Sequence, residues 1–214
     1  MRTRLLFTVS ALLLLLVASA AAQTLSPIQL PPPRTDGGRP LMQALKERHT
    51  TREFAAKPLP PQALSDLLWA GFGVNRPDGH RTAPSAQNWQ EIDIYVALPE
   101  GVYLYDAKAN LLQPVVAGDL RGATGSQPFV AQAGANLIYV SDGKKTGNGS
   151  AESRMSMTYA DTGFIAQNVY LFCASEGLVS VVRASVDRAA LSKKLNLRPE
   201  QQITLAQSVG YPKP

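Results

Sequence analysis

The stretch of this 214-residue chain whose residue types offer the most specific chemistry is Lys46–Phe54, KERHTTREF. Arg48, Thr50 and Arg52 stand at every second position, so a non-helical turn can direct both guanidinium groups and the hydroxyl to one side. A guanidinium group binds phosphate oxygens through a planar fork of donors, and a threonine hydroxyl adds a further donor. The spacing therefore indicates a phosphate-binding turn, with a solvated charged turn as the alternative.

Other residue types that bind metals or act as nucleophiles are scarce. The chain has two histidines, His49 and His80, and one cysteine, Cys173, and shows no cluster of ligands at metal-binding spacing. We therefore expect no metal centre. We interpret His80 as a surface histidine, with a proton donor beside a substrate as the alternative. Cys173 lies in an apolar helical stretch and is expected to be a core residue.

Acid–base catalysis has no clear candidate either. Asp161 and Glu176 fall on one predicted helix, but spacing identifies no partner for them. The catalytic residues are therefore left unassigned.

Residues 1–22 have the features of a signal peptide. Arg2 and Arg4 precede an apolar run at 5–17, and Ala20-Ala21-Ala22 forms an A-x-A cleavage pattern before Gln23. The run is shorter than the roughly 20 residues of a membrane span, although a retained anchor is the alternative. We expect cleavage near Ala22 and a periplasmic or secreted protein. Because Arg2-Thr3-Arg4 is not a twin-arginine pair, any cofactor would bind after export.

The length and net charge of the chain after residue 22 limit the number of domains and the kinds of partner it can have. Removing 22 residues leaves 214 − 22 = 192, enough for one domain with a substantial core. The net charge falls from +5 to 5 − 2 = +3 without Arg2 and Arg4, and no basic helix accompanies it, so nucleic-acid binding is not expected. A single cysteine allows no intrachain disulfide.

Hydrophobic spacing and turn residues predict the order of elements. Residues 23–40, rich in proline and glycine, are expected to be an extended arm rather than a packed element, or else a strap over a partner subunit. Ser185 is expected to cap the last helix. Helices are expected at 41–48, 62–72, 155–176 and 186–195, and strands at 92–98, 102–105, 111–116, 136–140, 179–182 and 203–209.

This order predicts an α+β domain over residues 41–214, with a mostly antiparallel or mixed central sheet flanked by helices. No G-x-G-x-x-G follows a predicted strand, which disfavours a Rossmann fold. The helix at 155–176 carries apolar residues on more than one face, so we expect it in the centre of the fold or in a dimer interface.

Four segments, in this order, resemble the flavin-dependent nitroreductase family. They are the Arg48-x-Thr50-x-Arg52 turn, Ala83–Gln90 (APSAQNWQ), Gly177-Leu178 and Val209-Gly210-Tyr211-Pro212. Within that family, three stretches look most like the branch with the azoline-forming peptide dehydrogenases: Gly71–Arg76, Arg81–Ala86 and Gly101–Asp106. The resemblance runs from about Met42 to Tyr211.

The resemblance implies a nitroreductase-like homodimer that binds FMN between its subunits. Arg48, Thr50 and Arg52, with His49 between them, would hold the phosphate and ribityl chain. Pro84, Ser85 and Asn88 would contact the isoalloxazine ring of the neighbouring subunit's cofactor. A backbone N–H near Ala184 and Ser185 would face flavin N5.

Two departures from the family pattern stand out. Many relatives have Pro-x-Glu-Gly where this chain has Val182-Arg183-Ala184-Ser185, so Arg183 would lie beside the flavin or supplement the phosphate site. Relatives often continue past Gly-Tyr with a basic tail, whereas here Lys213 alone offers that charge.

The resemblance implies hydride transfer between flavin N5 and a small organic substrate. A nitroaromatic compound, a quinone or an azoline-type substrate would be compatible, with NAD(P)H or another electron donor. The alternative is an exported flavin- or ligand-binding module that keeps the fold without turnover. A structural domain without a cofactor is a third possibility. It would require the match of the phosphate turn, Ser85 and Asn88 to the family pattern to be a coincidence.

Overall fold

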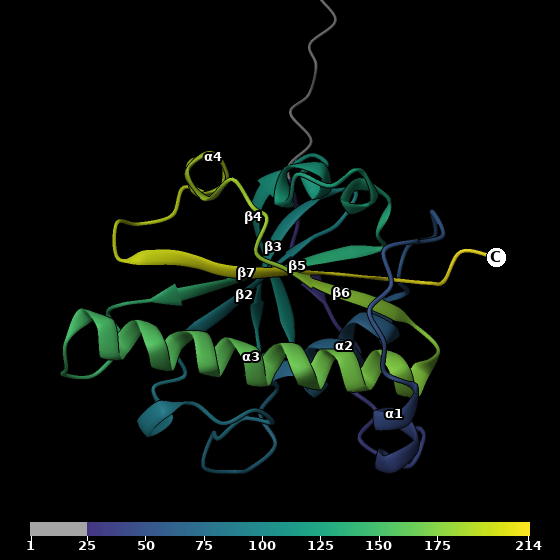
Figure 1. Cartoon of the computed structure of the whole chain (residues 1–214), viewed down its shortest axis with the longest axis horizontal. Helices are drawn as coiled ribbons and strands as arrows, with labels where there is room; N and C mark the ends of the chain where they lie inside the picture. Colours follow the sequence, from purple (N-terminus) through teal and green to yellow (C-terminus); the bar gives the residue numbers. More distant parts are fainter. Residues whose placement is uncertain (1–24) are drawn as a thin grey trace, which may run out of the picture.

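The computed structural model describes residues 25–214, so the predicted signal peptide at 1–22 lies outside the described part of the chain. Within residues 25–214, seven strands form one antiparallel sheet in the order β1-β4-β3-β2-β5-β7-β6 (Figure 1). The strands are β1 (Ile28–Gln29), β2 (Ile92–Ala97), β3 (Gly101–Asp106), β4 (Leu111–Ala117), β5 (Ala135–Asp142), β6 (Val179–Arg183) and β7 (Gln201–Gly210).

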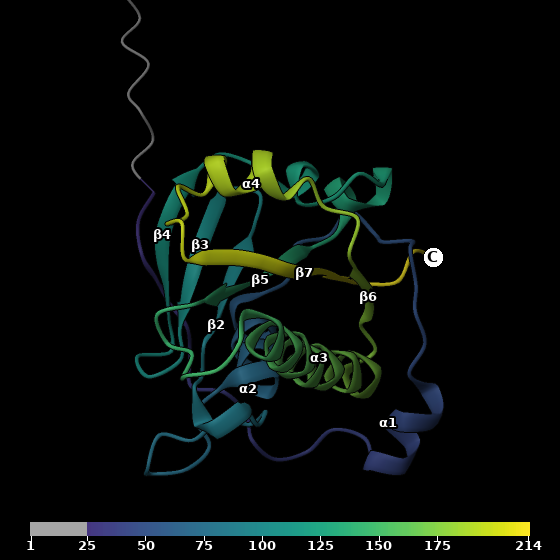
Figure 2. The same ribbon diagram turned by 60° about the vertical axis from the view of Figure 1, so that its left-hand side comes forward.

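Helices cover both faces of this sheet. Figure 2 shows α2 and α3 on one face and α4 on the other. The helices of the described chain are α1 (Leu41–Glu47), α2 (Pro61–Phe72), α3 (Ala151–Glu176) and α4 (Arg188–Lys194), with short 3₁₀ turns η1 (Ala86–Asn88), η2 (Arg121–Thr124) and η3 (Pro128–Gln132).

Alternation along the central strands creates a core on each side of the sheet. On β5, Leu137 and Tyr139 pack with Leu68 of α2 and Ile165 of α3, whereas Ile138 packs against α4. Successive side chains of a strand point to opposite faces, so a strand covered on both faces is buried along its length and largely apolar. All eight residues of β5 are buried accordingly.

The α+β class and the antiparallel sheet flanked by helices are confirmed. Each helix and strand predicted from spacing is present, with ends shifted by a few residues. The predicted helix at 155–176 begins earlier, at Ala151, because the Ser150 hydroxyl caps it by accepting a hydrogen bond from the Ser153 N–H (3.1 Å).

The predicted cap of the last helix was wrong. Helix α4 begins at Arg188, and the Asp187 carboxylate accepts the Ala190 N–H (3.0 Å), so Asp187 is the N-cap. Ser185 lies outside the helix, and its hydroxyl is 2.5 Å from the Ser126 hydroxyl. A carboxylate at the positive end of a helix dipole competes well with a hydroxyl two residues earlier.

Residues 25–40, the described part of the predicted arm, are extended as predicted, but the expectation that the arm does not pack was wrong. β1 pairs with β4 through Ile28↔Leu112 and Gln29↔Leu111, and Leu30 is only 2 % exposed. The Pro31 carbonyl accepts hydrogen bonds from Ser65 (2.5 Å) and Asn110 (2.7 Å). Proline lacks an N–H but keeps its carbonyl as an acceptor. The arm also donates, through the Leu30 N–H to the Asn110 carbonyl (3.1 Å) and the Arg34 N–H to Asp66 Oδ1 (2.7 Å).

Among residues 25–214, no helix combines the length and apolar character that crossing a bilayer requires.

Candidate functional site

The Arg-Thr-Arg turn follows α1 directly and lies along β6, the last strand of the sheet. Thr50 forms a parallel bridge with Ser180, and the Thr51 N–H donates to the Ser180 carbonyl (3.1 Å). An edge strand exposes unpaired backbone groups on its outer side, and this segment uses one of them. The backbone of the turn is therefore anchored to the sheet.

Tyr170 of α3 organises the side chains of the turn. Its hydroxyl lies 3.1 Å from the Thr50 hydroxyl and accepts the Val182 N–H of β6 at 2.8 Å. The Arg48 guanidinium stacks over the Tyr170 ring, 5.3 Å from its centroid. One side chain thus joins the turn, the helix and the edge strand.

The two arginines of the turn have no acidic partner. Neither Arg48 nor Arg52 belongs to an ion pair found within residues 25–214, and Arg52 is exposed. The His49 ring points back, with Nδ1 2.8 Å from the Glu47 carbonyl. Two cations four positions apart, neither in an ion pair within the described chain, fit an anionic ligand such as a phosphate.

The edge of β6 continues into exposed backbone at Ala184 and Ser185. Neither N–H of these two residues donates a backbone hydrogen bond within the described chain. The Ser185 carbonyl accepts the Ser126 N–H at 3.3 Å, which ties this backbone to the segment after η2. The edge that carries the Arg-Thr-Arg turn therefore also offers open N–H donors.

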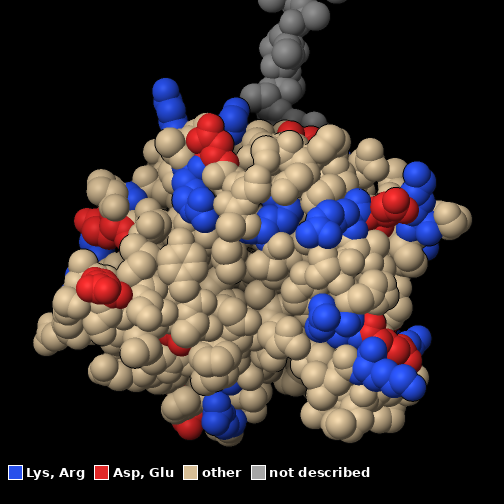
Figure 3. Space-filling model, in the orientation of Figure 1, with Lys and Arg blue, Asp and Glu red and all other residues tan. Residues whose placement is uncertain are grey.

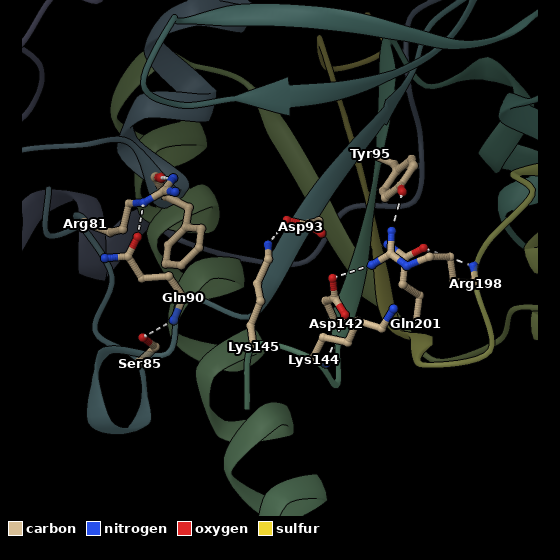
Figure 4. Close-up of polar contacts among 11 residues, drawn as sticks. Arg81, Ser85, Gln90, Asp93, Tyr95, Asp142, Lys144, Lys145, Arg198 and Gln201 are labelled. Atoms are coloured by element: carbon tan, nitrogen blue, oxygen red, sulfur yellow. Dashed lines mark hydrogen bonds and ion pairs between the residues drawn. The ribbon is translucent and has the colours of Figure 1, made fainter. Parts of the chain in front are cut away.

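The Pro84–Asn88 segment forms a tight loop around η1. The Ser85 hydroxyl accepts the Gln90 N–H (3.0 Å), and Asn88 Oδ1 accepts from the Gln90 amide (2.9 Å). The Gln90 amide oxygen in turn accepts from Arg81 Nε at 2.8 Å (Figure 4). The Ser85 O–H and the Asn88 amide N–H groups remain as donors for a ligand.

The two predicted halves of the site contact α3 at different positions along the helix. The Pro84–Asn88 loop contacts the helix at Asp161, whose carboxylate accepts the Ala86 N–H (2.8 Å), whereas the Arg-Thr-Arg turn contacts it at Tyr170. Nine residues of helix separate these contacts, which is about 14 Å at a rise of 1.5 Å per residue. Within one chain the two halves therefore contact different turns of α3.

Arg183 is a correction to the predicted site. Its guanidinium is buried, with the residue 4 % exposed, and donates to the Thr124 carbonyl (2.7 Å), Asn136 Oδ1 (3.0 Å) and Ser208 Oγ (3.2 Å). Burial lowers the pKa of Arg183 to about 10, so the group stays charged at neutral pH. Strand alternation turns this side chain into the protein, and it presents no donor to a ligand on the sheet edge.

The structure also places the cysteine and the histidine that the sequence singled out. Cys173 is buried, and burial raises the pKa of its thiol far above the ordinary value, as expected of a core residue. His80 is half-buried in its loop, beside Asp78. Within the described residues, no group of three His, Cys, Asp or Glu side chains could hold a metal ion.

Sequence reasoning missed three side chains that organise the site: Tyr170, Asp161 and Glu91. Their partners lie far away in the chain, so spacing could not reveal the contacts. The available signals were weak: a tyrosine within a helix, and acidic residues in otherwise apolar surroundings. Such residues need a hydrogen-bond partner when buried, but the sequence does not say which one.

The two larger cavities lie elsewhere. One of about 550 Å³ lies between the arm, α1, α2 and α3 and is lined by Arg34, Trp69 and Phe172 among others. Another of about 550 Å³ lies around Pro58–Pro61 and Tyr211. Neither includes a predicted flavin-binding residue, so the candidate site is open surface in a single chain.

A seven-stranded antiparallel sheet with helices on both faces, and a basic turn on its edge strand, defines the nitroreductase-like class of α+β proteins. A structure of a candidate nitroreductase from Ralstonia eutropha JMP134 superimposes with a TM-score of 0.84 at 41 % identity, over 88 % of this chain and 90 % of that chain. The NADPH:FMN oxidoreductase of Vibrio harveyi, complexed with NAD⁺, shares the fold at a TM-score of 0.62 and 18 % identity, over 81 % and 69 % of the two chains.

Sequence comparison gives the same family. Residues 45–211 match the Nitroreductase family. A candidate nitroreductase of Methanocaldococcus jannaschii is 32 % identical over 151 residues, which cover 66 % of this chain and 76 % of that protein. The chain belongs to the nitroreductase family.

Proposed function

We propose that this protein is an FMN-dependent oxidoreductase that transfers hydride between the flavin and a small organic substrate such as a nitroaromatic compound or a quinone. The observation that carries the proposal is the edge of β6, where Arg48, Thr50 and the open N–H groups at Ala184 and Ser185 lie along one surface. Membership of the nitroreductase family supports an oxidoreductase. When bound, FMN would supply the redox chemistry.

The roles of the chain's own groups follow from their positions. Arg48 and Arg52 belong to no ion pair within the described chain and are suited to the FMN phosphate, and the Thr50 hydroxyl, oriented by Tyr170, adds a donor. The register Phe54↔Pro212 places Lys213 opposite Glu53, next to Arg52, where it can add positive charge. The N–H groups at Ala184 and Ser185 are suited to acceptor atoms of the flavin ring system.

We propose that the working unit is a homodimer. The Pro84–Asn88 loop and the Arg-Thr-Arg turn contact α3 at positions about 14 Å apart, and neither larger cavity of the single chain includes their residues, so a second chain would complete the site. In a two-fold dimer, each face meets its own copy, so the turn of one chain can approach the loop of its partner. A pocket closed by the partner would also exclude water from the substrate.

The proposal extends to the electron donor and the compartment. NADH or NADPH is the proposed donor, and the signal-peptide pattern of residues 1–22 supports export, with FMN bound afterwards. An azoline-type substrate, oxidised rather than reduced, uses the same flavin chemistry, but no described residue favours it over a nitroarene or quinone.

The test is a two-step reduction assay on FMN-loaded protein without oxygen. NADH or NADPH should bleach the flavin absorbance, and a nitroarene or quinone should then restore it. Restoration by neither class, with an azoline peptide also unchanged, would contradict the substrate assignment. If the protein binds FMN but shows no turnover with either a reduced nicotinamide or an electron carrier reduced by dithionite, the non-catalytic binding module is favoured.

A further inference from the structure

The loop after Ser85 has unusual backbone strain. Gln87, Asn88 and Gln90 all have positive φ, at 49°, 56° and 50°. Residues other than glycine seldom adopt this region, because the side chain crowds the backbone. Three such residues within four positions persist only when surrounding contacts hold them.

Contacts within the loop and contacts from residues outside it hold this shape. Gln90 donates its N–H to Ser85 Oγ and its side-chain amide to Asn88 Oδ1 and to the Gly79 carbonyl. Arg81 donates to the Gln90 side chain, as Figure 4 shows. From α3, Asp161 Oδ2 accepts the Ala86 N–H at 2.8 Å. Asp161 therefore fixes the first residue of η1 to the long helix.

A second acid is buried beside this anchor. Glu91 follows the loop directly and is 0 % exposed, and Asp161 is 3 % exposed. Neither carboxyl oxygen of Glu91 accepts a hydrogen bond within the described chain, and neither acid belongs to an ion pair there. Two adjacent buried carboxylates cannot both be ionised without a large free-energy cost.

Glu91 is therefore the acid of this pair that is expected to hold a proton near neutral pH. Burial, and after it the charge of Asp161, raises the pKa of Glu91 to about 7. A protonated Glu91 can donate to Asp161 and leave the other Asp161 oxygen for the Ala86 N–H. An ionised Glu91 would instead repel Asp161.

Several other titratable and charged groups lie nearby and have partners of their own. From β5, the Asp142 N–H donates to the Glu91 carbonyl (2.9 Å), and the Asp142 carboxylate pairs with Arg198. From α3, the Thr158 hydroxyl lies near Glu91. On β2, Asp93 is already paired with Lys145 at 2.5 Å (Figure 4). From the 75–85 loop, Arg81 binds Gln90 and the Phe72 carbonyl, and His80 pairs with Asp78. Asp161 is the charged group that bears directly on Glu91.

We propose that Glu91 and Asp161 are positioning residues that together hold the Pro84–Asn88 loop in the shape that receives the flavin. Protonated Glu91 keeps Asp161 on the Ala86 N–H. Ionisation of Glu91 above neutral pH weakens that anchor and loosens the loop. The role in flavin binding rests on the proposed function, whereas the coupling between the acid pair and the loop does not.

The first experiment measures that coupling without flavin. In ¹⁵N-labelled protein covering residues 23–214, which include the whole described fold, the Ala86 amide resonance should titrate with a midpoint of about 7 between pH 5.5 and 8.5. In Glu91→Gln, whose amide cannot ionise, the resonance should stay constant. His80→Gln, which removes the nearby histidine, should keep the wild-type titration.

The second experiment measures FMN dissociation constants across the same pH range. The ratio of the wild-type dissociation constant to that of Glu91→Gln should be about fivefold higher at pH 8.5 than at pH 6. A fivefold change corresponds to the loss of about one hydrogen bond. The FMN phosphate ionises in the same way in both titrations, so its effect cancels in the ratio of the two dissociation constants. Asp161→Ala should weaken FMN binding at every pH, whereas Thr162→Ala, another buried truncation one residue along α3, should not.

The outcomes separate this inference from the proposed function. An Ala86 resonance that does not titrate, or that titrates equally in Glu91→Gln, would overturn the acid-pair inference even if FMN binds. A titrating resonance with a constant FMN affinity ratio would overturn the link to the flavin. If no flavin binds at all, the proposed function fails, and the Ala86 titration still decides the coupling.

Discussion

At the scale of single residues, Tyr170 connects more of the candidate site than any residue that spacing could identify. Its ring carries Arg48, and its hydroxyl joins Thr50 to the Val182 N–H of the edge strand. The hydroxyl therefore serves two functions, because it orients a proposed phosphate ligand and satisfies a backbone donor.

Replacing Tyr170 by Phe should separate these functions from packing. The ring that supports Arg48 stays, but Thr50 loses its partner and the Val182 N–H is left unpaired. We expect a loss of about 1 kcal/mol in the free energy of unfolding and about fivefold weaker FMN binding. Urea unfolding and flavin titration measure the two effects, with Tyr95→Phe, whose hydroxyl lies beside Gln201 (3.5 Å) and away from the turn, as the control. Unchanged FMN affinity in Tyr170→Phe would contradict this role.

Glu91 should also make the stability of the protein depend on pH. Its pKa is raised from 4.5 to about 7, so the folded state binds more protons than the unfolded state between these values. Stability from this group is fully present below pH 4.5 and is lost as pH rises to about 7, a change of about 3 kcal/mol.

Urea unfolding of wild type and Glu91→Gln at several pH values between 5 and 8.5 checks this prediction. The difference in unfolding free energy between the two proteins should change across that range in favour of the variant at high pH. If the unfolding free energies of the two proteins change in parallel with pH, Glu91 titrates in the same way in the folded and unfolded states, which would contradict the prediction.

The sequence predicted the site unevenly, for physical reasons that differ between residues. The alternation of Arg48, Thr50 and Arg52 is local, so their spacing alone pointed to a common function. Tyr170 and Asp161 act through contacts with segments more than 70 residues away, which no local pattern encodes. Arg183 was placed at the flavin from its neighbours in the chain, but strand alternation directs it inward to Thr124 and Asn136.

At the scale of elements, hydrophobic periodicity predicted the helices and strands well, and polar capping contacts explain the differences at their ends. Helix α3 extends to Ala151 because Ser150 caps it, although residues 151–154 lack an apolar pattern. The short strand β1 was missed because two residues in a proline-rich arm show no period.

Helix α4 offers a direct comparison of two possible caps. Asp187→Ala removes the acceptor of the Ala190 N–H and should lower the unfolding free energy by about 1 kcal/mol. Ser185→Ala removes a hydroxyl outside the helix and should cost less. Thermal unfolding of the two variants measures the difference, and a larger loss for Ser185→Ala would contradict the assignment of the cap.

At the scale of the whole molecule, α1 and α3 leave apolar side chains exposed in the single chain. These exposed residues are Leu41, Met42, Leu45, Met155, Met157, Tyr159 and Phe164. Figure 3 shows that the face over much of α3 carries few charges, with lysines, arginines and acids gathered toward its margins. An apolar surface of this kind is typical of a protein–protein interface.

The homodimer proposal predicts that one substitution on this face affects assembly and cofactor binding together. Phe164 is 47 % exposed, and Phe164→Asp would place a charge in the proposed interface. Sedimentation should show a dimer for wild type and a monomer for the variant, with a matching loss of FMN. Gln113→Asp, on exposed β4 at the other side of the sheet, adds the same charge and should remain a dimer. A wild-type monomer that retains FMN would contradict the shared site.

The most direct test of the central claim, that FMN binds at the Arg-Thr-Arg turn, is the visible absorption spectrum of purified residues 23–214. The account predicts flavin bands at about one FMN per chain, with FMN identified after denaturation, and loss of these bands in the double variant Arg48→Ala/Arg52→Ala. Lys193→Ala/Lys194→Ala, which removes two charges from the end of α4, should keep the flavin. A colourless wild type that takes up no added FMN, or a double variant with unchanged occupancy, would contradict the claim.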